Sequence, residues 1–134
     1  MTTQILFVAF SHSLTEGQIA DAKASLGIEK IILLKEVAPE LQIKMSQIPA
    51  TATISQIKDL AIAVVDVAAY HEATHFYVAG EPAFTMHSAL EAASKYKFKV
   101  VSSTTERVSK ETAQPDGSIV KTAVFQHVQW RPMF

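Results

Sequence analysis

The chain has 134 residues, 49% of them hydrophobic, and a formal net charge of −1 at pH 7. This length and hydrophobic content predict one domain over residues 1–134 and exclude a disordered chain. The lack of cysteine excludes disulfides and thiolate metal sites, and the near-neutral charge argues against duplex DNA binding, which needs a broad basic surface.

Residues 5–10 form a short, continuous apolar run that is typical of a buried strand. The run is too short for a signal or membrane helix, so we expect a cytoplasmic protein without a membrane partner. A helix follows, and two N-caps compete for its start: Ser13 with Glu16, or Thr15 with Gln18. Gly27 is placed to end this helix.

A second buried strand is expected at residues 30–34, and the next helix at about residues 55–70. Pro39 and Pro49 lie between them, so residues 35–53 are predicted to be loop with one helical turn at most. Ser55 is the expected cap of the long helix. Its buried stripe is predicted to be Ile57, Leu60, Ala61, Val64 and Ala68.

A third strand is expected at residues 75–79, followed by a helix over residues 82–95 and a strand over residues 98–103. Pro82 suits the first turn of that helix. Its inward side chains are predicted to be Met86, Leu90 and Ala93.

The last part of the chain has the pattern of a hairpin, with arms at residues 108–113 and 119–130 around a turn at residues 114–118. Alternation predicts two faces for the second arm. Phe125 and His127 lie on one, and Val124, Val128 and Trp130 on the other. The whole order predicts an α/β fold: a short Rossmann-like, mostly parallel sheet with a C-terminal antiparallel β-hairpin.

Three of the predicted strands stop abruptly in small polar residues. Ligands of open parallel sheets bind outside the carboxyl ends of the strands, so we expect these three stretches to form one pocket for an anionic ligand. The stretches are Ser11-His12-Ser13, Gly80-Glu81-Pro82 and residues 102–107.

Ser11 and Ser13 offer hydroxyls at a helix start, where backbone N–H groups also attract anions. His12 is a candidate acid or base near neutral pH. The alternative is that Ser13 only caps the helix and that His12 is a surface residue.

Gly80 permits a close approach of a ligand, Thr85 follows in the next turn, and Glu81 is a candidate acceptor for an adenine amine or ribose hydroxyls. An ordinary tight turn explains the same residues equally well.

Three hydroxyl side chains and Arg107 lie at the fourth strand end, and Arg107 is the best candidate for a phosphate clamp. A surface ion pair of Arg107 with Glu106 or Glu111 is the alternative. The hydroxyl residues with a predicted binding role are Ser103, Thr104 and Thr105.

His127 is a second candidate for proton transfer, although a lone histidine on a hairpin is more often structural. No histidine and carboxylate cluster has the spacing of a metal site, and the aspartates are predicted to lie away from the strand ends. The sequence also lacks a P-loop and a dinucleotide-binding glycine motif, so no metal and no cofactor are expected.

Several short motifs resemble small CRISPR-associated proteins of the Csx type, single-domain relatives of the CRISPR-associated Rossmann-fold (CARF) sensors. The resemblance covers nearly the whole chain. It rests on residues 10–15 with Gln18 and residues 21–22, on residues 104–107, and on residues 116–121 and 124–128.

The resemblance implies a homodimer that binds a cyclic oligoadenylate, the second messenger of type III CRISPR defence, across its two-fold axis. It also implies ring-nuclease activity, most simply on cyclic tetra-adenylate. Such cleavage needs no metal, because a ribose 2′-hydroxyl can attack the adjacent phosphate. On this hypothesis His12, with His127 second, transfers protons, Arg107 stabilises charge and Ser11 orients the phosphate. A sensor or sponge that binds without cutting is the main alternative, and an interaction domain without a nucleotide is the third.

Overall fold

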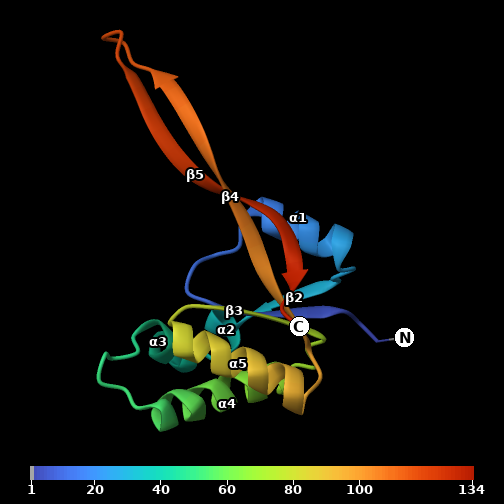
Figure 1. Ribbon diagram of the computed structural model, residues 1–134. Helices are drawn as coiled ribbons and strands as arrows, with labels where there is room; N and C mark the ends of the chain where they lie inside the picture. Colours follow the sequence, from blue (N-terminus) through green and yellow to red (C-terminus); the bar gives the residue numbers. More distant parts are fainter. Residues whose placement is uncertain (1) are drawn as a thin grey trace.

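The structure is a computed structural model that describes residues 2–134, and it is an α/β fold built on one five-stranded sheet (Figure 1). The strand order is β2-β1-β3-β4-β5, and all pairings are parallel except the antiparallel β4–β5 pair. The predicted mostly parallel sheet with a C-terminal antiparallel pair is therefore confirmed. The elements are β1 (Ile5–Phe10), α1 (Glu16–Ser25), β2 (Lys30–Leu33), α2 (Leu34–Val37), α3 (Pro39–Ser46), α4 (Ile54–Tyr70), β3 (His75–Ala79), α5 (Pro82–Lys95), β4 (Lys99–Ala113) and β5 (Ile119–Pro132).

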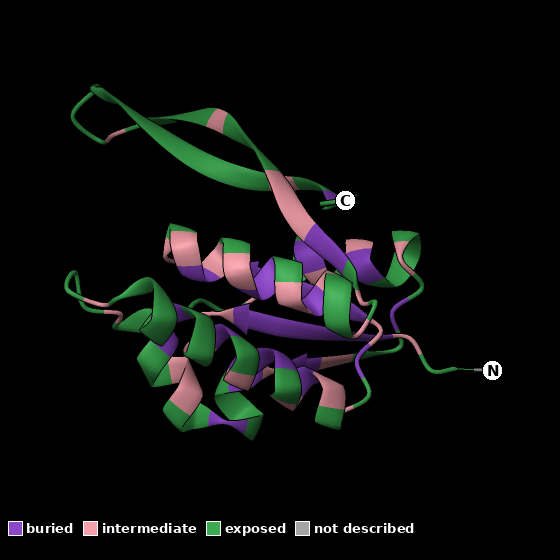
Figure 2. Cartoon of the chain, turned by 60° about the horizontal axis from the view of Figure 1, so that its bottom comes forward, coloured by how far each residue is buried: buried purple, intermediate pink, exposed green. Residues whose placement is uncertain are grey.

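Helices cover both faces of the sheet, so the central strands are buried on both sides (Figure 2). Phe7 and Phe76 point into the larger core, which lies beneath α4 and α5 and includes Phe84. Leu6 and Tyr77 point the other way, into a smaller core with α1. None of the helices within residues 2–134 combines the length and apolar character needed to span a bilayer.

Capping boxes start α1 and α4, and the predicted cap of α4 is wrong. Thr15 caps α1 and its box partner is Gln18, so the structure realises the second of the two predicted starts rather than Ser13. Thr53 with Gln56 does the same for α4, two residues before the predicted Ser55 cap. Gly27 has a φ of +67° and follows the end of α1 as predicted.

The prediction of a mostly irregular segment at residues 35–53 is wrong, because α2 and α3 occupy much of it. Pro39 is the first residue of α3, where its missing N–H would have no helical partner in any case. Leu34 and Met45 are buried in the larger core, and this burial stabilises two short helices.

The inward face of α5 also differs from the prediction. Met86 and Leu90 are 52% and 46% exposed, whereas Phe84, Ser88 and Ala92 are buried. The small side chains of Ser88 and Ala92 let α5 lie close to its neighbours. A prediction based on side-chain hydrophobicity favours larger residues and so misses these two.

The largest difference concerns β4, which does not end at Ser103 but continues as one strand to Ala113. Beyond Ser103 it pairs only with β5, and the two strands project from the sheet as an arm (Figure 1). We call residues 106–113 of β4 and 119–126 of β5 the outer arm. Because β4 is parallel to β3, the arm leaves the sheet on the side of the carboxyl strand ends.

An irregularity between Thr104 and Thr105 changes which side chains share a face of β5. Thr104 lies opposite Gln129 and Thr105 lies opposite His127, so Val128 is an extra residue between them. His127 and Trp130 therefore both face α1, with their rings 5.2 Å apart. The predicted strict alternation, which put them on opposite faces, is wrong for this reason.

Candidate functional site

The carboxyl ends of β1 and β3 lie side by side at one edge of the sheet, with Phe10 in register with Ala79. The chain crosses from β1 to β2 through α1 on one face, and from β2 to β3 through α4 on the other. The gap between β1 and β3 is thus the topological switch point, where open α/β sheets bind ligands. Ser11–Ser13 and Gly80 flank this point, so two of the three predicted stretches meet.

Lys35 brings a cation to this edge, and the sequence analysis missed it. It is the second residue of α2, which begins directly after β2, and its Nζ donates a hydrogen bond of 3.0 Å to Oγ of Ser13. Gln42 from α3 donates to the carbonyl of Phe10 at 3.1 Å and fixes the end of β1. The edge therefore holds an ammonium group and hydroxyls beside the N-terminus of α1, a combination suited to an anion.

His12 and Ser11 are exposed in the loop between β1 and α1. The imidazole of His12 packs against the ring of Phe10, with centroids 5.1 Å apart in an edge-on arrangement. Its position is thus restrained by an aromatic contact while the ring remains open to solvent. This is an arrangement in which a histidine can exchange protons with a bound ligand.

Glu81 has a structural role, which the sequence alone could not distinguish from a role in ligand binding. It is the N-cap of α5, and its two carboxylate oxygens accept hydrogen bonds from the backbone N–H groups of Ala83 and Phe84 at 3.1 and 2.8 Å. These bonds occupy the anion-attracting end of α5. Both helix starts near the edge are therefore capped by their own side chains, α5 by Glu81 and α1 by Thr15.

Gly80, Thr85 and Ser103 line one open cavity of about 500 Å³ between α5 and β4. Its other walls are mainly apolar, with contributions from Met86 and Leu90. The Oγ1 of Thr85 is buried and has no hydrogen-bond partner among residues 2–134. A cavity of this size and polarity can accept a flat apolar group such as a nucleobase.

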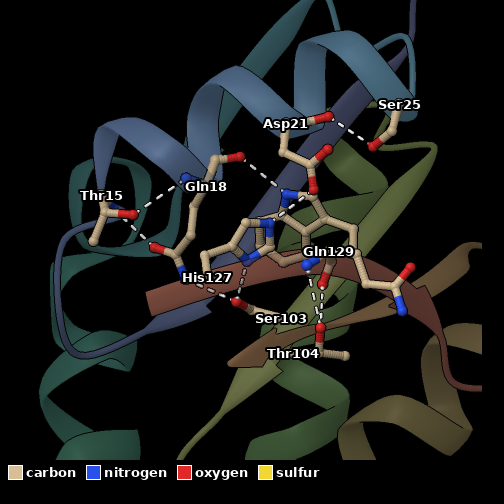
Figure 3. A network of polar contacts seen from close by, with 9 residues as sticks. Thr15, Gln18, Asp21, Ser25, Ser103, Thr104, His127 and Gln129 are labelled. Carbon is tan, nitrogen blue, oxygen red and sulfur yellow. Dashed lines mark hydrogen bonds and ion pairs between the residues drawn. The ribbon is translucent and has the colours of Figure 1, made fainter. Parts of the chain in front are cut away.

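A second polar cluster, which we call the arm junction, ties β4 and β5 to α1 (Figure 3). Its members are Gln18, Asp21, Ser103, His127 and Trp130. The amide Oε1 of Gln18 accepts from the backbone N–H of Thr15, so Nε2 points to Ser103 and donates to its Oγ at 3.1 Å. The Ser103 hydroxyl then donates to Nδ1 of His127 at 2.6 Å, which leaves Nε2–H of His127 to donate to Asp21 at 2.8 Å.

The arm junction is largely withdrawn from solvent. The side chain of His127 is 5% exposed, and Trp130, whose Nε1 donates to the Gln18 carbonyl at 3.0 Å, is equally buried. The hydrogen bond from His127 holds the pKa of Asp21 below its usual value of 3.8, against the opposing effect of burial. Both nitrogens of His127 are occupied, so this histidine anchors the arm in the present arrangement.

The remaining predicted binding residues lie along the arm rather than at the strand-end edge. They are Thr104, Thr105 and Arg107. Thr104 exchanges hydrogen bonds with the backbone of Gln129, and Thr105 is exposed opposite His127. Arg107 is exposed in the outer arm, about 13 Å beyond Ser103 at about 3.3 Å per residue. Arg107 does not form the alternative ion pair with Glu111, whose carboxylate instead lies 3.6 Å from Nζ of Lys121.

Two of the three predicted stretches therefore follow neighbouring strand ends, those of β1 and β3. The third does not follow a strand end: Ser103 lines the cavity beside Gly80, and the later residues continue along the arm. Asp21 was set aside because it lies in a helix, yet that helix brings it to His127, more than a hundred positions away in sequence. Within residues 2–134, no three histidine, aspartate or glutamate side chains gather closely enough to hold a metal ion.

Comparisons with known proteins give one consistent result. A family model described as "Uncharacterized protein MJ1673 family" matches residues 4–131, which include all of β1 and all but the last residue of β5. Uncharacterized protein MJ1673 of Methanocaldococcus jannaschii is 28% identical over 127 residues, which cover 94% of each chain. No solved structure matches the chain.

Proposed function

The chain belongs to the MJ1673 family, and for this member we propose a metal-independent ring nuclease that binds and cleaves a cyclic oligoadenylate at the strand-end edge. Cyclic tetra-adenylate is the expected ligand, and the chain is proposed to act as a cytoplasmic homodimer that switches off type III CRISPR signalling. The resemblance of its motifs to Csx-type proteins supports the ligand class. We further propose that the sheet is a short Rossmann-like, CARF-like sheet, which the position of the switch point supports.

The contact between Lys35 and Ser13 is the observation that carries this proposal. It places an ammonium group 3.0 Å from a hydroxyl at the switch point, although Ser13 lies in the loop after β1 and Lys35 lies in α2 after β2. A phosphodiester there would receive a charge-assisted hydrogen bond from Lys35 and a neutral one from Ser13. Without Lys35, the edge would still offer the hydroxyls of Ser11 and Ser13, but it would have no ammonium group.

Two cavities flank the edge and supply room for bases. One is the cavity beside Gly80, and the other, of about 570 Å³, lies between α3 and the start of α4. Because α4 runs antiparallel to β3, its start also lies on the side of the carboxyl strand ends. An apolar wall on each side of a phosphate-binding edge suits a ring of alternating adenosines and phosphates.

Cleavage follows from the chemistry of the ribose without an external nucleophile. The 2′-oxygen attacks the adjacent phosphorus, the bond from phosphorus to the 5′-oxygen breaks, and the products are a 2′,3′-cyclic phosphate and a 5′-hydroxyl. A base takes the proton of the 2′-hydroxyl and an acid protonates the 5′-oxygen. We assign proton transfer to His12, the exposed histidine at the edge, and charge stabilisation to Lys35 with Ser11 and Ser13.

This assignment changes two roles that the sequence suggested. Both nitrogens of His127 are engaged in the arm junction, so it ranks behind His12 as an acid or base. Arg107 lies in the outer arm of its own chain, and for that reason Lys35 replaces it beside the phosphate.

The test is incubation of the purified protein, below the substrate concentration, with labelled cyclic tri-, tetra- and hexa-adenylates in the presence of EDTA. We expect multiple turnovers of one ring size to products with 2′,3′-cyclic phosphate ends. Binding of an intact ring without products would identify the sensor or sponge. Loss of cleavage in EDTA, or no interaction with any of the rings, would contradict the proposal.

Two matched pairs of variants test the residues. Lys35→Gln is expected to weaken ring binding about tenfold, whereas Lys30→Gln, at the other end of β2, leaves binding unchanged. His12→Ala is expected to slow cleavage by about 10²- to 10⁴-fold, and His71→Ala, at the end of α4, has no such effect. Equal effects within either pair would show that the edge is not the site.

A further inference from the structure

The outer arm is a surface without a partner in its own chain. Apart from the half-buried Val108, every residue of the outer arm is exposed, and Figure 2 shows both strands of the arm standing clear of the helices. From Ser103 to Ala113 the arm extends about 33 Å at about 3.3 Å per residue. Two-stranded hairpins are marginally stable in water unless a further strand or a packed face supports them.

The two strands of the outer arm differ in chemistry. Residues 106–113 of β4 include four charged side chains, whereas residues 119–126 of β5 include one, Lys121. The β5 segment also carries large exposed apolar groups, with Phe125 at 75% and Ile119 at 62% exposure. Charged residues protect the free edge of a strand, so the edge of β4 is protected and the edge of β5 is not.

The unprotected edge belongs to the last strand of the sheet. Nothing pairs with the outer side of β5 over its described length, Ile119–Pro132, and Pro132 is the only residue there without a backbone N–H. An unpaired, extended strand with few charged side chains is a template for the addition of another strand.

We infer that β5 is the interface between two copies of this chain, which pair antiparallel along their outer arms. Each copy carries the same unpaired strand, so one two-fold axis satisfies both edges at once and closes the assembly at a dimer. The outer arm with its turn carries three acidic and three basic residues, so two arms approach without net repulsion. The charged edge of β4 disfavours further growth into a longer sheet.

The homodimer of the proposed function gains a defined interface from this inference, but the inference rests on β5 and needs no nucleotide. Association is therefore measured on the protein without ligand, by sedimentation equilibrium over a range of concentrations. The wild-type chain is expected to sediment with twice the mass of one chain. A monomer at every concentration would overturn the inference, while leaving nucleotide binding to be judged by its own assay.

The interface is tested by placing charges on the free edge. The double variant Ile119→Lys with Phe125→Lys is expected to raise the dimer dissociation constant by about tenfold or more. The control Tyr70→Lys changes a residue of α4 that is 84% exposed, and it is expected to remain dimeric. A dimeric double variant, or dissociation caused by Tyr70→Lys, would place the interface elsewhere.

A variant with a shortened arm provides a second test in case the charged double variant does not fold. Val108 and Val124 lie opposite each other, so residues 109–123 can be replaced by Asn-Gly, which favours a two-residue hairpin turn. This variant keeps the arm junction and is expected to unfold cooperatively as a monomer. If it remains dimeric, the outer arm does not hold the copies together. Association of wild-type β5 with another protein but not with itself would equally contradict the inference.

Discussion

The arm junction and the outer arm are made from the same two strands, yet their surroundings are opposite. At the junction, Ser103, His127 and Trp130 lie against α1 with every polar side-chain atom paired. In the outer arm, a few residues further along the same strands, the side chains are open to solvent on both faces. Strand pairing is therefore common to both regions, and packing against α1 is what distinguishes them.

This difference shows where the stability of the hairpin comes from. Cross-strand pairs in an exposed ribbon contribute little, whereas a buried aromatic ring and a network of shielded hydrogen bonds contribute much more. We therefore expect substitutions in the junction to lower the free energy of unfolding of one chain much more than substitutions in the outer arm do. All such measurements need one fixed protein concentration, because the stability of a dimer depends on concentration.

The largest effect is expected for Trp130→Ala. This substitution removes a ring that is 5% exposed, packs 4.9 Å from the ring of Tyr77 and donates to the carbonyl of Gln18. A cavity remains and the carbonyl loses the indole donor, so urea unfolding should show a loss of about 3–5 kcal/mol.

Phe134→Ala is the control for that experiment, because it removes an aromatic ring that is near in sequence but 71% exposed. Its cost should stay within about 0.5 kcal/mol. Similar losses for the two variants would mean that the junction does not carry the stability of the hairpin.

The contrast between the arm junction and the outer arm also shows which features of the structure could be predicted from the sequence. The parallel strands and the polar ends of β1 and β3 follow from local patterns, and the predictions there agree with the structure. The arm junction depends on contacts of residues 18 and 21 with residues 103, 127 and 130, which no local pattern reveals. The extra residue Val128 reverses the alternation that a strand pattern assumes, and so it hid the shared face of His127 and Trp130.

Lys35 illustrates the same limit at the strand-end edge. Its segment was predicted to be loop because of Pro39 and Pro49, although Pro39 in fact begins α3. Only the order of β2 and β1 in the sheet shows that a residue after β2 lies beside Ser13. The ends of strands can therefore be predicted from the sequence. Contacts between side chains that follow different strands can be identified only once the order of the strands in the sheet is known.

Asp21→Asn tests the electrostatic part of the junction and is expected to have an intermediate effect. The pKa of Asp21 is lowered in the folded protein, so its charged form stabilises the fold above the unfolded pKa of 3.8. The variant should lose about 1.5 kcal/mol at pH 7, typical of a hydrogen bond to a charged group. The gap from the wild type should then narrow as the pH falls below about 4.

Asp59→Asn, on the exposed side of α4, is the matched control, and its stability should follow that of the wild type at each pH.

His75 gives a different dependence of stability on pH, because burial lowers its pKa from 6.5 in the folded state and Lys99 adds to the shift. Its protonation favours unfolding, so stability from this residue is lost as the pH falls below about 6.5, in both the wild type and Asp21→Asn. A constant gap between these two proteins from pH 7 to pH 2 would exclude a role for the Asp21 charge.

The smallest effect is expected for the outer arm, where Lys121 and Glu111 form an ion pair of 3.6 Å with both side chains largely exposed. Solvent screens this pair and both long side chains lose freedom when they meet, so Lys121→Met should change the free energy of unfolding by less than about 0.5 kcal/mol. A double-mutant cycle with Glu111→Gln separates the pair from the loss of each side chain, and its coupling energy should fall below that of Asp21 with His127. If the cycle instead gave a coupling above about 1 kcal/mol, the pair would have to be shielded from water. The cycle repeated in the Ile119→Lys with Phe125→Lys background would then identify what shields the pair, because a coupling that disappears there would assign the shielding to the second copy.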